Sequence, residues 1–276
     1  MKKFLTVAFL MISVVMVAQN YKVMTYNIRL DVASDGENTW DLRKDHVASL
    51  LQFYEPDIVG IQEGLPHQVH YLDSLLQNYM VLGQGRDGGQ KGEQSSVFYN
   101  ENTFEELESN TFWLSETPEK VSKGWDAQLN RICTYALFKN KKTKEVFWVF
   151  NTHLDHIGEV ARLKSVQLIH EMIATKNKKN YPVVIMGDLN SSPESNPVKF
   201  LNENYLNSKK EAAFVYNATG TFNGFDFFKP VTAEIDYIFL SKQKIVVKKY
   251  AVLTDSYSCK YPSDHFPVMV EFQITK

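Results

Sequence analysis

Polar side chains capable of acid–base or metal chemistry follow several apolar runs in this sequence. In residues 181–193 the apolar run 183–186 is followed by Gly187, Asp188 and Asn190. A short continuous apolar run is typical of a buried strand in a sheet that is covered on both faces. We therefore expect Asp188 and Asn190 to project from the rigid end of a strand into a cleft.

The same arrangement recurs at other expected strand ends. The full set of polar residues is Asn27, Glu63, His153, Asp188, Asn190, Asp236, Asp264 and His265. Oxygen ligands dominate this set, which favours a hard cation such as Mg²⁺, with Mn²⁺ and Ca²⁺ as alternatives, over Zn²⁺. Histidines beside carboxylates supply general acid–base chemistry. The residues predict metal-assisted hydrolysis of a phosphate ester.

Other residues near these positions have two interpretations each. Arg131 begins an expected strand that ends at the same cleft, where its guanidinium could hold a phosphate with two hydrogen bonds. A surface ion pair is the alternative. Asp155 and His156 extend the His153 motif and are candidates for the lining of the site. For Trp40 we favour a packing role over a substrate platform.

Apolar periodicity predicts an α/β protein that positions these groups. Helices are expected from residue 41, from residue 66 and over 158–175. Strands are expected at 23–28, 57–62, 94–99, 131–138, 145–151, 183–186, 234–240, 245–253 and, as an edge strand, 266–274. Residues 83–92 read as a flexible glycine-rich loop, and 111–129 as a long connection. Both ends of the chain contribute to the expected site, which argues for one domain.

The N-terminus has the pattern of a secretory signal peptide. Lys2 and Lys3 precede an apolar run that ends near Ala18, and this run is shorter than a bilayer span. We expect cleavage after Ala18, a single catalytic domain over 19–276, a secreted or periplasmic protein without stable membrane insertion, and a monomer. The two cysteines, Cys133 and Cys259, are expected to be unpaired.

The charge of the chain argues against one class of partner. The formal net charge is −2 over 276 residues, whereas tight nonspecific binding of duplex nucleic acid requires many cationic contacts with phosphates. Nucleic acid is therefore a possible but not a favoured partner.

The ordered motifs TYNIR, IVGIQE, NTHLDH, MGDLNSSP, IDYIF and SDHFPV resemble those of the endonuclease/exonuclease/phosphatase superfamily, which is also called deoxyribonuclease I-like, and of a secreted bacterial subgroup of it. The resemblance covers nearly all of the chain after residue 22. It implies a four-layer α/β/β/α sandwich, in which two packed mixed sheets are flanked by helices.

The resemblance also implies roles for individual residues. Glu63 is similar to the main metal carboxylate of the family, with Asn27 beside it and Asp264 near it. Asp188 and Asn190 resemble the pair that orients the attacking water and holds a phosphate oxygen.

Two histidines complete the implied site. His265 resembles the histidine beside the scissile phosphate, with Asp236 as its carboxylate partner. His153 resembles a second histidine, for which the resemblance implies Glu93 as the supporting carboxylate. Asn223 stands where the family often has a histidine, which places any role of that position in doubt.

Together these features predict a secreted phosphoesterase that depends on a divalent metal and acts on a small or lipid-linked phosphoester. The signatures of the inositol phosphatases are missing, because Met186 precedes the GDLN motif and Ser191 follows it. The first alternative is a nonspecific extracellular nuclease. The second is a non-catalytic binding module on the same scaffold.

Overall fold

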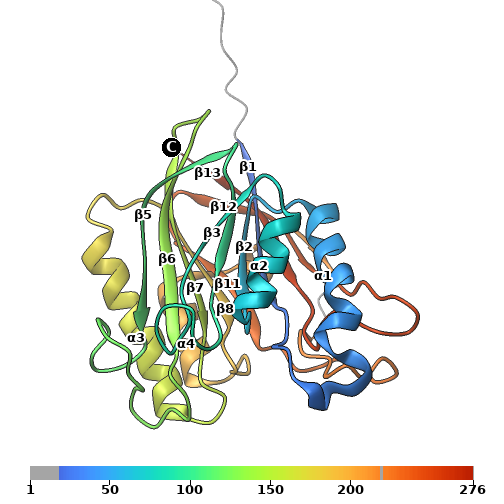
Figure 1. The fold of residues 1–276 in the computed structure, drawn as a ribbon. Coiled ribbons are helices and arrows are strands. Elements are labelled where there is room, and N and C mark those ends of the chain that lie inside the picture. Colours follow the sequence, from blue (N-terminus) through green and yellow to red (C-terminus); the bar gives the residue numbers. More distant parts are fainter. Residues whose placement is uncertain (1–18, 218–219, 276) are drawn as a thin grey trace, which may run out of the picture.

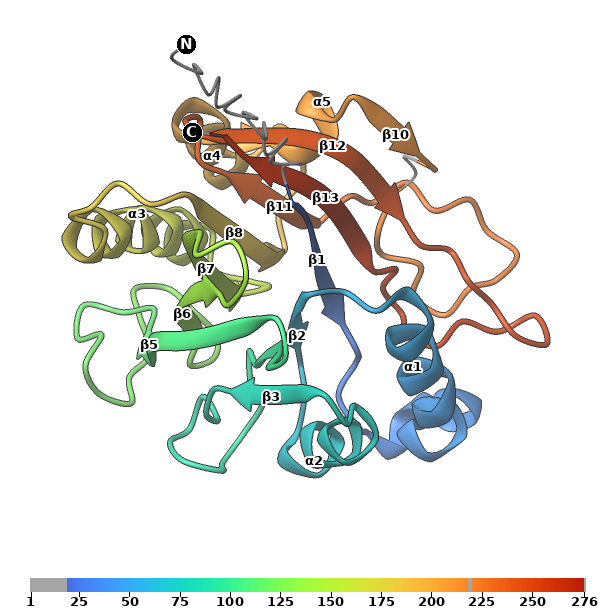
Figure 2. The same cartoon turned by 90° about the horizontal axis from the view of Figure 1, so that it is seen from above.

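The computed structural model describes residues 19–217 and 220–275. The predicted signal peptide, residues 1–18, lies outside the described residues. Two β-sheets pack face to face, with helices on their outer faces (Figure 1, Figure 2). The fold is thus the predicted four-layer α/β/β/α sandwich.

The first sheet has seven strands in the order β10-β12-β13-β1-β2-β4-β3, and the second has six in the order β5-β6-β7-β8-β11-β9. The strands are β1 Asn20–Asn27, β2 Ile58–Gln62, β3 Tyr79–Leu82, β4 Val97–Asn100, β5 Phe104–Trp113, β6 Ile132–Asn140, β7 Val146–His153, β8 Val183–Asp188, β9 Leu206–Asn207, β10 Phe214–Tyr216, β11 Asp236–Leu240, β12 Ile245–Val252 and β13 Val268–Ile274. The helices are the 3₁₀ helix η1 Ala33–Asn38 and the α-helices α1 Trp40–Tyr54, α2 Pro66–Leu75, α3 Glu159–Lys176, α4 Asn196–Asn204 and α5 Ser208–Glu211.

Three apolar clusters hold the layers together. The central cluster joins the inner faces of the two sheets and includes Val23, Phe138 and Phe272. A second cluster packs α3 and α4 against the second sheet, and a third packs α1 and α2 against the first sheet. Because both faces of each central strand are covered, these strands are apolar throughout rather than alternating.

The register of the strands brings the polar strand ends together. In the first sheet β1 and β2 are parallel, and Asn27 is opposite Gln62, the residue before Glu63. In the second sheet His153 on β7 is opposite Asp188 on β8, and Asp188 is opposite Asp236 on β11. These side chains consequently meet at one end of the sandwich, where Asn27 Nδ2 lies 3.0 Å from Asp188 Oδ2 across the two sheets.

A buried amide ties the two sheets together near this end. Asn151 on β7 donates hydrogen bonds from Nδ2 to the carbonyls of Ile61, at 3.0 Å, and Ser96, at 2.8 Å, in the first sheet. Gly60 makes room for it, because a Cβ at this position would lie 2.5 Å from Asn151 Oδ1. This contact fixes the distance between the strand ends of the two sheets.

Several local expectations were wrong. The last strand is not at an edge, because β13 pairs with both β1 and β12. Residues 111–113, expected in a long connection, belong to β5, and the strands β3, β5, β9 and β10 were not expected. The loop predicted at 83–92 is present and has internal backbone hydrogen bonds, such as Gly85 N to Gly89 O at 2.7 Å and Asp87 N to Lys91 O at 3.0 Å.

Two smaller expectations can be compared with the structure. Cys133 is buried and Cys259 is exposed, and both are free thiols, as predicted. Within residues 19–217 and 220–275, each helix is too short or too polar to cross a membrane.

Candidate active site

Asp188 is the centre of the site. Its Oδ2 accepts a hydrogen bond of 3.0 Å from Asn27 Nδ2 and lies 3.5 Å from His153 Nε2 and 3.8 Å from His265 Nε2. Its Oδ1 accepts a hydrogen bond from the backbone of Asn190 at 2.8 Å. Burial and the nearby Asp236 raise the pKa of Asp188 to about 7, although the positive charge of His265 opposes this. Asp188 is therefore suited to exchange a proton near neutral pH.

His265 and Asp236 form a buried pair. His265 Nδ1 lies 2.9 Å from Asp236 Oδ2. Burial lowers the pKa of His265, but the carboxylates of Asp236, Asp188 and Asp264 outweigh burial and raise it well above its ordinary value. The raised pKa favours the doubly protonated ring of His265, whose Nε2 lies 3.8 Å from Asp188 Oδ2.

His153 has the opposite electrostatic environment. Burial, reinforced by the positive charge of Arg131, lowers its pKa well below the ordinary value, so the ring is neutral. Asn190 donates from Nδ2 to His153 Nε2 at 3.0 Å and to the Leu154 carbonyl at 3.0 Å. Asn190 adopts a φ of 46°, a left-handed conformation that asparagine tolerates better than most residues. This conformation turns the Asn190 amide back toward His153.

Glu63 and Asp264 supply carboxylates on the first-sheet side of the site. Glu63 Oε1 accepts from Asn27 Nδ2 at 3.0 Å, and Glu63 Oε2 accepts from Leu30 N at 3.0 Å. Asp264 Oδ2 lies 3.8 Å from Arg29 Nε. Burial raises the pKa of Asp264, and Glu63 adds to this effect. Asn27 thus connects Glu63 with Asp188 as a donor.

The residues present fit a divalent cation. Glu63, His153 and Asp188 offer ligand atoms within 4.8 Å of one another, and so do Asp188, Asp236 and His265. Asp236 Oδ1 is buried and has no hydrogen-bond partner among the described residues. Clustered buried carboxylates with free oxygens repel one another unless a cation or a proton compensates their charge. Of the predicted ligands, Glu63 belongs to the first cluster, Asn27 bridges two carboxylates, and Asp264 lies beside Arg29.

Arg131 is buried at the cleft and is not a surface residue. Its Nε lies 3.3 Å from Asp155 Oδ2, and its Nη2 lies 3.0 Å from His156 Nδ1. Burial raises the pKa of Asp155, but backbone N–H groups, led by that of Gly158, and the Arg131 charge outweigh it and hold the pKa well below its usual range. Arg131 therefore points a permanently charged, anchored guanidinium at the cleft.

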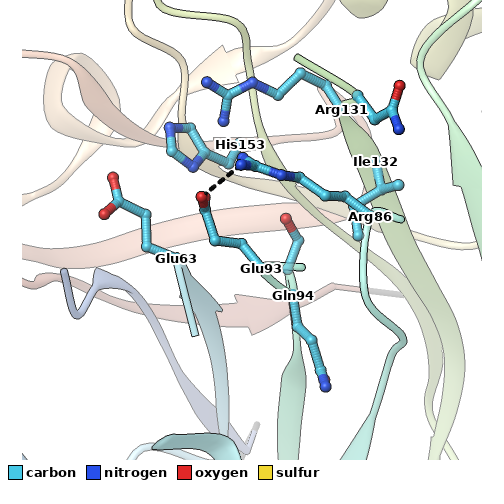
Figure 3. A pocket seen from close by; sticks show the side chains of 9 residues that line it. Glu63, Arg86, Glu93, Gln94, Arg131, Ile132 and His153 are labelled. Carbon is cyan, nitrogen blue, oxygen red and sulfur yellow. Dashed lines mark ion pairs between the residues drawn. The ribbon is translucent and has the colours of Figure 1, made fainter. Parts of the chain in front are cut away.

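Glu93 does not form the predicted pair with His153 in this structure. Its Oε1 instead forms an ion pair with Arg86 Nη2 at 2.7 Å (Figure 3). Glu93 and His153 nevertheless line the same pocket. The glycine-rich loop that carries Arg86 folds back over Glu93, and sequence spacing alone does not reveal that return.

Two supporting residues escaped the sequence analysis. Arg43 on α1 is fully buried and donates to the carbonyls of Ile28, Arg29, Asn38 and Pro262. Ser263 donates from Oγ to the Asn27 carbonyl at 2.7 Å. Both join the loop after β1 to the loop before β13, and so align Asn27 with Asp264. For Arg43, the only signal in the sequence was a charged residue at a position of the helix that faces the core.

Two other uncertain residues have packing roles. Trp40 is 2% exposed and belongs to the cluster beneath α1, in agreement with the packing role favoured from sequence. Asn223 donates from Nδ2 to the Ser263 carbonyl at 3.1 Å and accepts from Phe225 N at 2.8 Å. Asn223 thus stabilises the loop beside Asp264.

The site opens into one cleft of about 410 Å³. Most of the residues that line it are polar in type, and the lining includes Arg29, Glu63, Arg86, Glu93, Arg131, His153, His156, Asp188, Asn190, Phe222, Asp264 and His265. Asn27 and Asp236 lie behind this surface and hold Asp188 and His265. The strand-end residues predicted from sequence are therefore brought together around one cleft.

Solved structures of similar chains share this fold. An endonuclease/exonuclease/phosphatase family protein from Bacteroides thetaiotaomicron is 37% identical and superposes with a TM-score of 0.89, covering 94% of this chain and 100% of its own. The mannosyl-6-phosphatase Bt3783 from Bacteroides thetaiotaomicron is 39% identical, with a TM-score of 0.87, and covers 91% of this chain and 99% of its own.

Curated relatives are more distant. The Ccr4 3'-5'-exoribonuclease subunit of Kluyveromyces lactis is 22% identical over 302 residues, which cover 86% of this chain and 38% of that protein. The chain spans only 34–59% of the length of the curated relatives that it matches.

The profile of the "Endonuclease/Exonuclease/phosphatase family" matches residues 24–265. This match covers most of the chain and contains every strand-end residue of the site, so the chain belongs to the endonuclease/exonuclease/phosphatase family.

Proposed function

We propose that this protein is an exported, monomeric, Mg²⁺-dependent phosphoesterase that hydrolyses a small phosphate ester, with a sugar phosphate as the favoured substrate. The observation that carries this proposal is the convergence of both histidine Nε2 atoms on Asp188 Oδ2, at 3.5 and 3.8 Å, inside one cleft of about 410 Å³. A cleft of this volume matches a small ligand. The phosphatase activity in the name of the 39% identical relative supports the same class of substrate.

The residues divide the chemistry between them. Asp188, with a pKa of about 7, accepts a proton from the attacking water, and Asn190 orients that water. Protonated His265 gives its Nε2 proton to the leaving oxygen as the P–O bond breaks, Asp236 holds the proton on His265 Nδ1, and Asp188, 3.8 Å away, can return the proton taken from water to His265. Stabilisation of charge on the phosphoryl group is expected to be a large part of the rate acceleration.

Glu63 is the main residue that would hold the metal, with Asp264 and the amide oxygen of Asn27 nearby. A divalent cation at this position supplies charge neutralisation and polarises a phosphoryl oxygen. Arg131 is anchored by Asp155, whose Oδ2 lies 3.3 Å from Arg131 Nε. It adds a fixed positive charge for the phosphate and is not a metal ligand.

The proposal is tested with a substrate panel. Purified protein is incubated with mannose 6-phosphate, p-nitrophenyl phosphate, bis(p-nitrophenyl) phosphate, sphingomyelin, RNA and plasmid DNA, each with Mg²⁺ and with EDTA. We expect EDTA-sensitive release of phosphate or p-nitrophenol from a small ester. Rapid degradation of plasmid or RNA would instead favour the nuclease alternative. The similarity to the Ccr4 exoribonuclease is the observation that supports this alternative. No turnover of any ester would favour the binding module.

Export is tested separately. The full-length chain is produced in a Gram-negative host, and the N-terminus of the material in the periplasm and medium is sequenced. We expect a chain that begins at Gln19. A full-length chain retained in the cytoplasm would contradict the proposed signal peptide and leave the catalytic proposal unaffected.

A further inference from the structure

The pair formed by Arg86 and Glu93 is unexplained by the chemistry above. The loop between β3 and β4 holds both residues: Arg86 N donates to the Glu93 carbonyl at 2.9 Å, and Trp113 Nε1 donates to the Arg86 carbonyl at 2.7 Å. Gly85 is required there, because a Cβ would lie 2.0 Å from the Lys91 carbonyl oxygen. The backbone of this loop therefore fixes where the two side chains emerge.

Arg86 retains an unused hydrogen-bond donor. Its Nη2 forms an ion pair with Glu93 Oε1 at 2.7 Å, but its Nη1 is buried, and none of the residues that the structure describes accepts a hydrogen bond from it. Figure 3 shows the pair beside His153 and Glu63 at one wall of the pocket. A buried guanidinium N–H without a partner costs free energy, and a ligand oxygen in the cleft would supply the missing acceptor.

The charge of the pair indicates which kind of oxygen this is. A phosphate would meet the Glu93 carboxylate next to the guanidinium, and the two negative groups would repel each other. A hydroxyl group both donates and accepts, so neighbouring hydroxyls match a carboxylate acceptor and a guanidinium donor that lie side by side. Arg131 and His265 offer the phosphate a better place, because both line the cleft and Asp155, the carboxylate partner of Arg131, does not.

We propose that Arg86 and Glu93 form a hydroxyl-binding subsite that recognises a polyhydroxylated leaving group, such as the sugar of a sugar phosphate. Arg86 Nη1 donates to one hydroxyl oxygen, and the Glu93 carboxylate accepts from a neighbouring hydroxyl. This inference rests on the proposed function and adds the residues that select the leaving group. Both are binding residues and take no part in proton transfer.

The test compares two substrates with the same phosphate and different leaving groups. Mannose 6-phosphate presents hydroxyls, whereas phenyl phosphate presents none. For Arg86→Ala and Glu93→Gln we expect kcat/KM for mannose 6-phosphate to fall by ~10- to 10²-fold, the scale of a lost hydrogen bond to a charged group. The same variants should change kcat/KM for phenyl phosphate by less than about threefold.

Controls separate this outcome from damage to the fold. Arg86→Lys keeps the charge but not the planar fork, and it should lose the preference for the sugar ester while its Tm stays close to wild type. Lys142→Ala, at an exposed turn, should leave both substrates unaffected. Equal losses on both substrates in Arg86→Lys or Glu93→Gln would overturn the subsite, because they indicate a role in catalysis or folding.

Failure of the subsite differs from failure of the proposed function. Wild-type protein that hydrolyses phenyl phosphate but shows no preference for any of a set of hexose phosphates would overturn the subsite alone. Wild-type protein that hydrolyses neither class would contradict the proposed function itself.

Discussion

His265 Nδ1 lies 2.9 Å from Asp236 Oδ2 in a fully buried contact, and Asp236 is opposite Asp188 across the β8–β11 pairing. One strand pairing thus places the carboxylate that holds the His265 proton beside the carboxylate that faces the substrate. The two have different environments: Asp236 is ion-paired, whereas the pKa of Asp188 is raised to about 7. Neighbouring carboxylates therefore take different roles.

Asp236→Asn should make the stability of the protein depend less on the protonation of His265. The pKa of His265 is raised in the folded state. The free energy of unfolding that protonated His265 contributes is therefore fully present below its unfolded pKa of about 6.5 and is lost as the pH rises through the folded pKa. We expect the difference in unfolding free energy between wild type and Asp236→Asn to be larger at pH 6 than at pH 9. Urea denaturation at both pH values measures it, and an equal or reversed difference contradicts the assignment.

Asp188→Asn and His265→Ala should each lower kcat by at least ~10²-fold, the scale of lost acid–base catalysis. Asp188→Asn keeps the shape but cannot take up a proton, and its single amide oxygen can accept from only one of Asn27 Nδ2 and Asn190 N. Steady-state kinetics on p-nitrophenyl phosphate checks both variants, with Lys142→Ala as the control. Near-full activity in either variant would remove that residue from the proposed chemistry.

Much of the site was predictable because it depends on local pattern. An apolar run followed by a polar residue identifies a strand end, and in this fold the strand ends meet. Asn27 and Asp188 were found in this way: Asp188 lines the cleft and Asn27 lies behind it, whereas His265 precedes its strand. The motif series also gave the correct four-layer arrangement, since that arrangement follows from the family resemblance and not from periodicity.

The errors concern contacts between segments that are distant in the sequence. The neighbours of β13 depend on strand order, so its interior position in the sheet was missed. The partner of Glu93 depends on the path of the 83–92 loop, which includes left-handed glycines such as Gly92 with a φ of 76°. Arg43 was missed as a support because its acceptors are carbonyls, which any residue type supplies.

Removal of divalent metal should abolish activity and lower stability. The cluster of Glu63, Asp188 and His153, with ligand atoms within 4.8 Å of one another, holds charges that a cation compensates. With Mg²⁺ at about 100 times its Kd, we expect Tm to rise by on the order of 5 °C over the EDTA-treated protein. Differential scanning fluorimetry measures this change.

Glu63→Gln tests whether this increase in Tm arises at the site. The variant should lose most of the Mg²⁺-dependent rise, whereas Glu105→Gln, on β5 and 54% exposed in its side chain, should retain it. An undiminished rise in Glu63→Gln would place the stabilising cation elsewhere on the protein.

Arg43→Met should destabilise the protein and reduce its activity, although Arg43 is not among the residues that line the cleft. Its guanidinium donates to Arg29 O at 2.6 Å and to Pro262 O at 3.3 Å, which joins the segments that carry Asn27 and Asp264. Methionine fills the volume but leaves buried carbonyls without donors. Each unsatisfied carbonyl costs about 1–3 kcal/mol of unfolding free energy. We expect a loss of at least ~2 kcal/mol in unfolding free energy by urea denaturation, together with weaker Mg²⁺ activation in the fraction that is folded.

Arg43→Lys should recover part of the stability, because one ammonium group replaces some of the donors. Wild-type Mg²⁺ activation in a destabilised Arg43→Met would show that Arg43 supports the fold without aligning the site.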